Sequence, residues 1–113
     1  MNYQTACDFL IEQGKATESQ TDALLSRLKQ GIPPVPGQVT SILLALKVIF
    51  DSLKGRAEIE RPFACALHSL AFESRRYFEA GMRAGTLWPP LLDEDLARIA
   101  AAVNSIFADD WQG

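Results

Sequence analysis

Apolar residues recur along this chain at intervals of three and four positions, which places them on one side of an α-helix. Five segments carry this spacing, at approximately 3–13, 21–30, 38–54, 62–80 and 93–107. No segment shows the alternation of apolar and polar residues that is typical of a half-buried strand. The pattern therefore predicts an all-α chain, folded as a compact bundle of four or five helices.

Residues that favour helix ends flank the first two segments. Asn2 is a suitable N-cap for the first helix, and Gly14 is expected to end it as a C′ glycine in the left-handed conformation. Ser19 or Thr21 can cap the second helix, and Gly31 is expected to end it. These two helices are therefore expected to be short and well delimited.

The third segment, 38–54, is apolar around most of its circumference. When its residues are placed at 100° intervals, the polar ones fall on one narrow stripe: Thr40, Lys47, Asp51 and Lys54. The main apolar face is formed by Val39, Ile42, Leu43, Leu46, Ile49, Phe50 and Leu53, and it is extended by Leu44 and Val48. A helix of this kind is buried on most sides. We therefore expect it to be central in the bundle, with the fourth helix packed against it, or to give half of its surface to an oligomer interface.

The fourth segment, 62–80, has apolar residues on two opposite sides. Pro62 suits the first position of a helix, because its fixed φ is helical. The expected inner face comprises Phe63, Ala66, Leu67, Leu70, Tyr77 and Phe78. On the opposite side lie Cys65, His68 and Phe72. This second patch needs a cover, either the first two helices of the same chain or a partner.

Two proline-containing segments separate the helices. We interpret residues 32–37, with three prolines, as a stiff extended connector, the alternative being a ligand for an aromatic groove. Trp88 precedes two further prolines beyond the fourth helix, and Trp111 follows the fifth. Tryptophan placed near helix ends is a favoured interface anchor. Both residues are therefore candidates for partner contact.

Composition indicates a single domain, 1–113, with no general attraction to nucleic acid. The 113 residues are 48% hydrophobic and 22% charged, with a net charge of −3. No apolar run approaches the roughly 20 residues of a membrane span, and no secretory signal opens the chain. Cys7 and Cys65 are expected to be unpaired, buried thiols. Together these features indicate a cytoplasmic protein with no membrane contact.

No set of residues has the spacing that catalysis or metal binding requires. There is no phosphate-binding loop, and one histidine with two cysteines cannot supply four zinc ligands. Cys65 and His68 are three residues apart, but His68 lacks an orienting carboxylate one turn away. Arg75, Glu79 and Arg83 are expected to form i,i+4 ion pairs, on a face that would suit an acidic partner. We assign no catalytic residue, metal or cofactor.

Three stretches resemble a family of small uncharacterised proteins of cyanobacteria. They are Pro36-Gly-Gln-Val-Thr-Ser-Ile-Leu-Leu-Ala-Leu-Lys-Val48, Leu70-Ala-Phe-Glu-Ser-Arg75 and Trp88-Pro-Pro-Leu-Leu-Asp-Glu-Asp-Leu96. The resemblance covers most of the chain from Pro36 onward. Some members carry a dethiobiotin synthetase label, which implies an ATP-dependent carboxylating enzyme with an α/β fold. This chain has neither the phosphate loop nor strands, so the label is not carried over to it.

The sequence favours a non-enzymatic helical interaction module, adaptor or regulatory in kind, that forms a homodimer or binds a protein partner. The candidate interaction surface comprises Leu44, Val48, Cys65, His68, Phe72, Arg75, Trp88 and Trp111. The alternative is a small-molecule-binding protein or enzyme with a pocket near His68, Phe72 and Arg75.

Overall fold

Helices account for most of the computed structural model, which describes residues 1–16 and 22–112. They are α1 (Tyr3–Gln13), α2 (Leu24–Lys29), α3 (Gln38–Leu53), α4 (Arg61–His68), the π-helical segment η1 (Ser69–Glu73), α5 (Ser74–Arg83) and α6 (Leu92–Ala108). Because α4, η1 and α5 follow one another without a break, they form one long helix. No strand occurs among the described residues. The predicted all-α bundle of four or five helices is confirmed.

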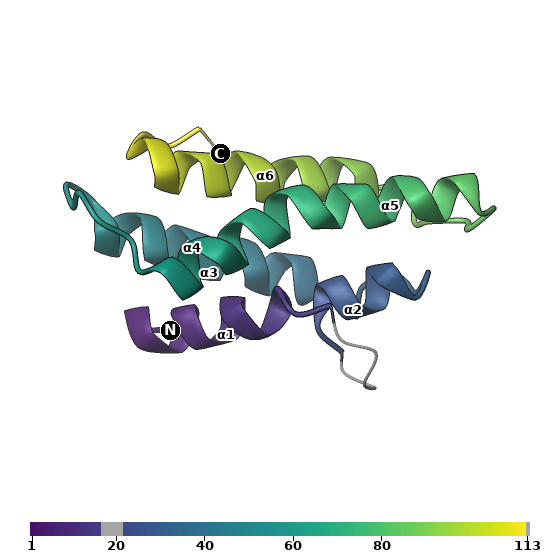
Figure 1. Cartoon of the computed structure of the whole chain (residues 1–113), viewed down its shortest axis with the longest axis horizontal. Coiled ribbons are helices and arrows are strands. Elements are labelled where there is room, and N and C mark those ends of the chain that lie inside the picture. The colour runs from purple at the N-terminus through teal and green to yellow at the C-terminus, as the bar shows by residue number, and fades with distance from the viewer. Residues whose placement is uncertain (17–21, 113) are drawn as a thin grey trace.

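The four longest helices surround one core (Figure 1). The α1 helix packs against α3 and α4, α3 also packs against α6, and α6 packs against η1. The short α2 covers α5 at one end. The long helix therefore lies mainly against α1, α2 and α6, diagonally across the core from α3. The expectation that it packs directly against the third helix is wrong, because residues 54–60 carry the chain across the end of the bundle.

The α3 helix buries one side, formed by Ile42, Ala45, Leu46, Ile49 and Phe50. Its polar stripe is exposed as expected, at Thr40, Lys47, Asp51 and Lys54. Leu44 lies within this exposed side, because it is one turn after Thr40 and one turn before Lys47. Its side chain is 62% exposed. Val48 is half-buried and packs against the core.

The long helix turns its apolar positions inward with the help of its π segment. The buried residues Phe63, Leu67, Leu70, Ser74 and Phe78 follow spacings of four, three, four and four. This mean spacing exceeds the 3.6 residues of an α-helical turn, and the wider η1 turn accommodates the difference. The Ser74 hydroxyl donates a hydrogen bond to the Leu70 carbonyl. Ala66 is buried and Tyr77 half-buried, so the predicted inner face is confirmed.

The helix ends agree with the sequence in part. The Asn2 side chain accepts a hydrogen bond from Thr5 N at 2.8 Å, and Gly31 has φ +74°, both as expected. Gly14 does not adopt the left-handed conformation, since its φ is −82°. A Cβ at Gly14 would lie 3.3 Å from the Ala66 carbonyl oxygen, so glycine here permits close approach of α1 to α4.

The second helix is shorter than expected. It begins at Leu24, with Ala23 as its N-cap and no side-chain cap. The predicted caps, Ser19 and Thr21, lie outside the described residues.

Candidate interaction surfaces

The first candidate surface lies along α3 and α6, which run in the same direction (Figure 1). A groove of about 440 Å³ lies on their outer side, lined by Leu43, Ala97, Arg98, Ala101, Ala102, Trp111 and Gln112. The alanines make its floor shallow and apolar. Leu44 is next to Leu43 on the same helix and is exposed. We call Leu43, Leu44, Ala97, Ala101 and Trp111 the α3–α6 face.

The chain after α6 folds back and forms one wall of this groove. The Trp111 ring lies 5.1 Å from that of Phe50, and the Lys47 ammonium lies 4.4 Å from the Trp111 ring centroid. Two further contacts hold the turn: Gln112 N donates to Ser105 Oγ at 2.6 Å, and Gly55 N donates to Asp109 Oδ2 at 3.0 Å. Trp111 nevertheless remains 39% exposed. It is thus part of the fold and also accessible to a partner.

The second candidate surface is the outward side of the long helix. Phe72 is 55% exposed and its ring stacks on His68, with centroids 5.3 Å apart. Cys65, one turn before His68, and Arg76, one turn after Phe72, are exposed as well. We call these four residues the Phe72 face. The interpretation that α1 and α2 cover Phe72 is wrong, because both helices pack on other sides of the long helix.

The two cysteines have different surroundings. Cys7 is buried as expected, at 7% exposure, whereas the expectation of a buried thiol is wrong for Cys65. Burial raises the pKa of the Cys7 thiol. Hydrogen bonding to Cys7 raises the pKa of the Tyr3 phenol, with burial as the second cause. Cys7 is therefore an unreactive core thiol, and Cys65 is accessible.

Arg75 and Trp88 lie at a third place, between α5 and the start of α6. Arg75 donates to the Asp93 carboxylate and, at 3.0 Å, to the Asp93 carbonyl. Arg76 pairs with Glu73. The expected i,i+4 pairs of Arg75 and Arg83 with Glu79 are not observed in the described residues, because Arg75 points toward α6 and finds a carboxylate there.

Trp88 is a structural residue rather than a free anchor. Its ring stacks on Phe78 with centroids 5.9 Å apart, and its Nε1 donates to the Phe78 carbonyl at 2.9 Å. The ring also lies over Gly81, where an added Cβ would be 2.5 Å from Trp88 Cζ2. The side chain is only half-exposed.

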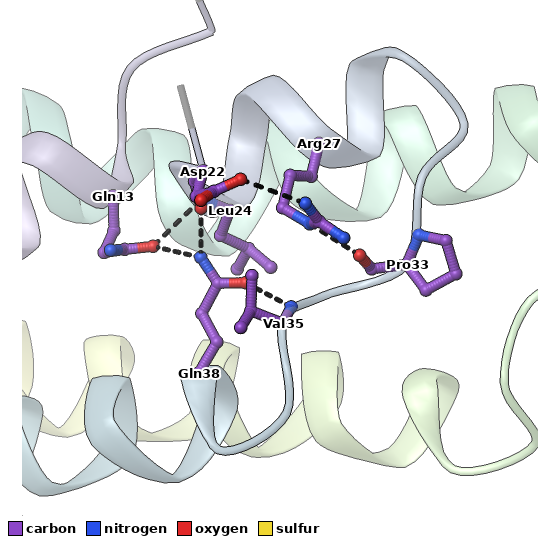
Figure 2. A network of polar contacts seen from close by, with 7 residues as sticks. All are labelled: Gln13, Asp22, Leu24, Arg27, Pro33, Val35 and Gln38. Carbon is purple, nitrogen blue, oxygen red and sulfur yellow. Dashed lines mark hydrogen bonds and ion pairs between the residues drawn. The ribbon is translucent and has the colours of Figure 1, made fainter. Parts of the chain in front are cut away.

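A buried amide network joins α1, α2 and α3 (Figure 2). Gln13 Oε1 accepts from Leu24 N at 2.9 Å and from Gln38 Nε2 at 2.7 Å. Gln38 Nε2 also donates to the Asp22 carbonyl at 2.6 Å, and its Oε1 accepts from Val35 N at 2.9 Å. This network was not predicted. Its signal in the sequence is that each glutamine continues an otherwise apolar helix face, Gln13 after Leu10 and Gln38 before Ile42.

The structure distributes the eight candidate residues over separate places. Leu44, Val48 and Trp111 belong to the side of α3 and the chain end, whereas Cys65, His68 and Phe72 lie on the long helix. Arg75 and Trp88 line another hollow, together with Met82, Leu87 and Asp93. His68 and Phe72 are therefore not brought together with Arg75 in one pocket.

Within residues 1–16 and 22–112, no group of three metal-ligating side chains is close enough to hold a metal ion. No helix in that part of the chain has the length and apolar character needed to cross a bilayer. A scan against protein-family models, a search of curated proteins and a search of solved structures found no significant match.

Proposed function

We propose that this chain is a non-enzymatic helical interaction module, adaptor or regulatory in kind, that self-associates through the α3–α6 face. One observation carries the proposal: Leu44 is 62% exposed, and it directly follows Leu43, which lines an apolar groove together with three alanines of α6. Exposed leucines are common singly, but one next to a groove of matching character is typical of an interface.

Leu44 would contribute apolar burial to a two-fold dimer through this face. Burying a leucine side chain stabilises by roughly 1.5–3 kcal/mol, and a two-fold axis makes each contact occur twice. Ala97 and Ala101 let a helix of the partner approach closely, because their side chains project little. Trp111 adds an aromatic residue at the edge, a type that often contributes strongly to binding.

Two further considerations support this choice. Leu44 is neither part of the core nor packed against it, so its apolar side chain is available to a partner. The alternative, a small-molecule site near His68, Phe72 and Arg75, has weaker support, because the Arg75 guanidinium is bonded to Asp93.

A cytoplasmic location fits the free thiols of Cys7 and Cys65, since disulfides are rare in that reducing compartment.

Sedimentation velocity at micromolar concentrations tests the proposal. We expect the wild type to dimerise and Leu44→Asp to sediment as a monomer of 12.5 kDa, because a carboxylate would be buried without a partner. Leu87→Asp is the matched control, since Leu87 is 94% exposed in the connection between α5 and α6. A monomeric wild type, or equal loss of association in both variants, would contradict the proposal.

A further inference from the structure

The chain reverses direction after α6 at a single residue. Asp109 has φ +53° and ψ +39°, a left-handed conformation, and within residues 1–16 and 22–112 it is the one residue other than glycine with a positive φ. This conformation is strained in an L-residue, because Cβ comes too close to the following carbonyl oxygen. If Asp109 became extended, the strain would be relieved and residues 110–112 would point away from their own α6.

The segment beyond this hinge is held by contacts at the surface. Residues 109–112 are all exposed. The Trp111 ring lies 5.1 Å from that of Phe50, and Asn104 Nδ2 donates to Gln112 Oε1 at 2.6 Å. Because residues 109–112 lie outside the helices, opening the segment breaks no contact between helices. It leaves Phe50 without its cover.

The site under this segment has its occupant defined by the contacts already formed. Phe50 is 4% exposed beneath Trp111, and Gly55 N donates to Asp109 Oδ2 at 3.0 Å. A second copy of the chain carries the same segment and offers the same groups. The segment of one copy can therefore satisfy the site of another, which is the general basis of domain swapping.

We propose that two copies exchange residues 109–112 when they associate, so that Trp111 of each copy packs on Phe50 of the other. The inference rests on the self-association proposed above and adds the residues that each copy contributes to the other's site. Exchange by itself repeats the contacts of the single chain and relieves the hinge at Asp109, a feature that favours swapping. The α3–α6 face supplies the rest of the attraction.

The length of the segment fits this arrangement. Trp111 lines the groove of the α3–α6 face together with Leu43, and the partner's Leu44 would lie against that groove. Phe50 follows Leu44 by six residues, about 9 Å along the helix at 1.5 Å per residue. Residues 109–111 in an extended conformation span about 10 Å. Trp111 can therefore reach the partner's Phe50.

A disulfide between positions 104 and 112 tests the exchange, because the side chains at these positions are in contact. The chain carries Asn104→Cys, Gln112→Cys and Cys65→Ser, the last to remove the accessible native thiol. After oxidation at micromolar concentrations, we expect a covalent dimer on a non-reducing denaturing gel, since the two new thiols that meet lie in different copies. The same chain with Leu44→Asp is the matched control. It should form the disulfide within one chain and give at least about tenfold less covalent dimer.

Sedimentation velocity on the same samples separates this inference from the proposed function. A dimer that forms only the disulfide within one chain overturns the exchange and leaves self-association standing, whereas a monomer overturns both. Equal amounts of covalent dimer with and without Leu44→Asp also overturn the exchange, because they would arise from random collision. Mass spectrometry of tryptic peptides identifies the link between positions 104 and 112.

Two substitutions at the hinge provide a second test. Asp109→Val disfavours the left-handed conformation and removes the acceptor of Gly55 N, so it should increase the covalent dimer about tenfold where the parent is mostly monomeric. Asp109→Asn should leave it unchanged, since asparagine tolerates this conformation and its side-chain carbonyl also accepts. Equal cross-linking in the two variants would exclude Asp109 as the hinge of the exchange.

Discussion

At the scale of single residues, Gly81 shows why one missing side chain matters. It lies inside α5 with an ordinary helical backbone. Its role is spatial, because the Trp88 ring occupies the space that a Cβ would fill. The glycine therefore allows Trp88 to stack on Phe78 and to bond the Phe78 carbonyl.

We predict that Gly81→Ala destabilises the protein by about 2 kcal/mol, although alanine is the better helix former by about 1 kcal/mol. The methyl group displaces Trp88 and breaks its hydrogen bond. Urea denaturation measures the free energy of unfolding, and tryptophan fluorescence in a Trp111→Phe background reports the displacement. Ala80→Gly, in the same helix, should cost about 1 kcal/mol without changing that fluorescence. A stabilising Gly81→Ala would refute the steric explanation.

The two cysteines give a second prediction at this scale. In native protein at neutral pH, a thiol reagent should modify Cys65 rapidly and Cys7 only at the rate of unfolding, because Cys65 is exposed and Cys7 buried. Mass spectrometry of Cys7→Ser and Cys65→Ser assigns each rate. Equal rates in the native state would show that Cys7 is accessible.

The raised pKa of Cys7 also predicts a dependence of stability on pH. A thiol whose pKa is higher in the folded state contributes its full stability below the unfolded value of about 9.0 and loses it as pH rises through the folded value. The free energy of unfolding should therefore fall on the alkaline side. The fall should be smaller in Cys7→Ala, and an identical pH profile in the two proteins would contradict this.

At the scale of elements, α2 depends on its connections. A helix of six residues is not stable by itself in water. Gln13 and Gln38 join its start to α1 and α3, and Arg27 fixes the following connector by donating to the Pro33 carbonyl at 2.7 Å (Figure 2). The proline-rich segment is therefore held as a connector, as the sequence indicated, by contacts at both of its ends.

We predict that Gln38→Leu destabilises the protein by about 2–3 kcal/mol. Val35 N loses its acceptor, and Gln13 Oε1 loses the hydrogen bond from Gln38 Nε2. Gln30→Leu, at the exposed end of α2, should change stability by less than about 0.5 kcal/mol. Hydrogen exchange of the Val35 amide gives a direct measure of the lost bond. Equal stability of the two variants would exclude a clamping role for the network.

The elements themselves were largely predictable, whereas their junctions were not. Each helix face follows from periodicity, which is a local property. The polar stripe of α3 and the two sides of the long helix were read correctly from it, but Leu44, which was placed with the apolar positions of α3, lies within its exposed side. The π turn was missed, because it depends on how far Leu70 and Ser74 must turn to face the core. The glutamine network was missed because its partners come from three separate segments.

At the scale of the whole molecule, the candidate residues were identified better than their grouping. A helical wheel gives the direction of Phe72 relative to Leu70, and that direction was right. It does not say which helix lies opposite, so Trp88, Arg75 and Phe72 were assigned to one surface although they belong to different ones. Trp111 was expected to be an anchor, and its contact with Phe50 was beyond sequence reasoning, since the two are distant in the chain.

The contact of Trp111 with Phe50 and Lys47 also ties the ends of α3 and α6 together, and this leads to a last prediction. Trp111→Ala should lower the free energy of unfolding by about 2 kcal/mol, because Phe50, now 4% exposed, loses its cover. Trp111→Phe should lose less, since the ring contact persists. Measuring both in the Leu44→Asp background separates this effect from association. With Leu44 restored, Trp111→Ala should also weaken the proposed dimer, because Trp111 forms a wall of the groove; unchanged association would place the interface elsewhere.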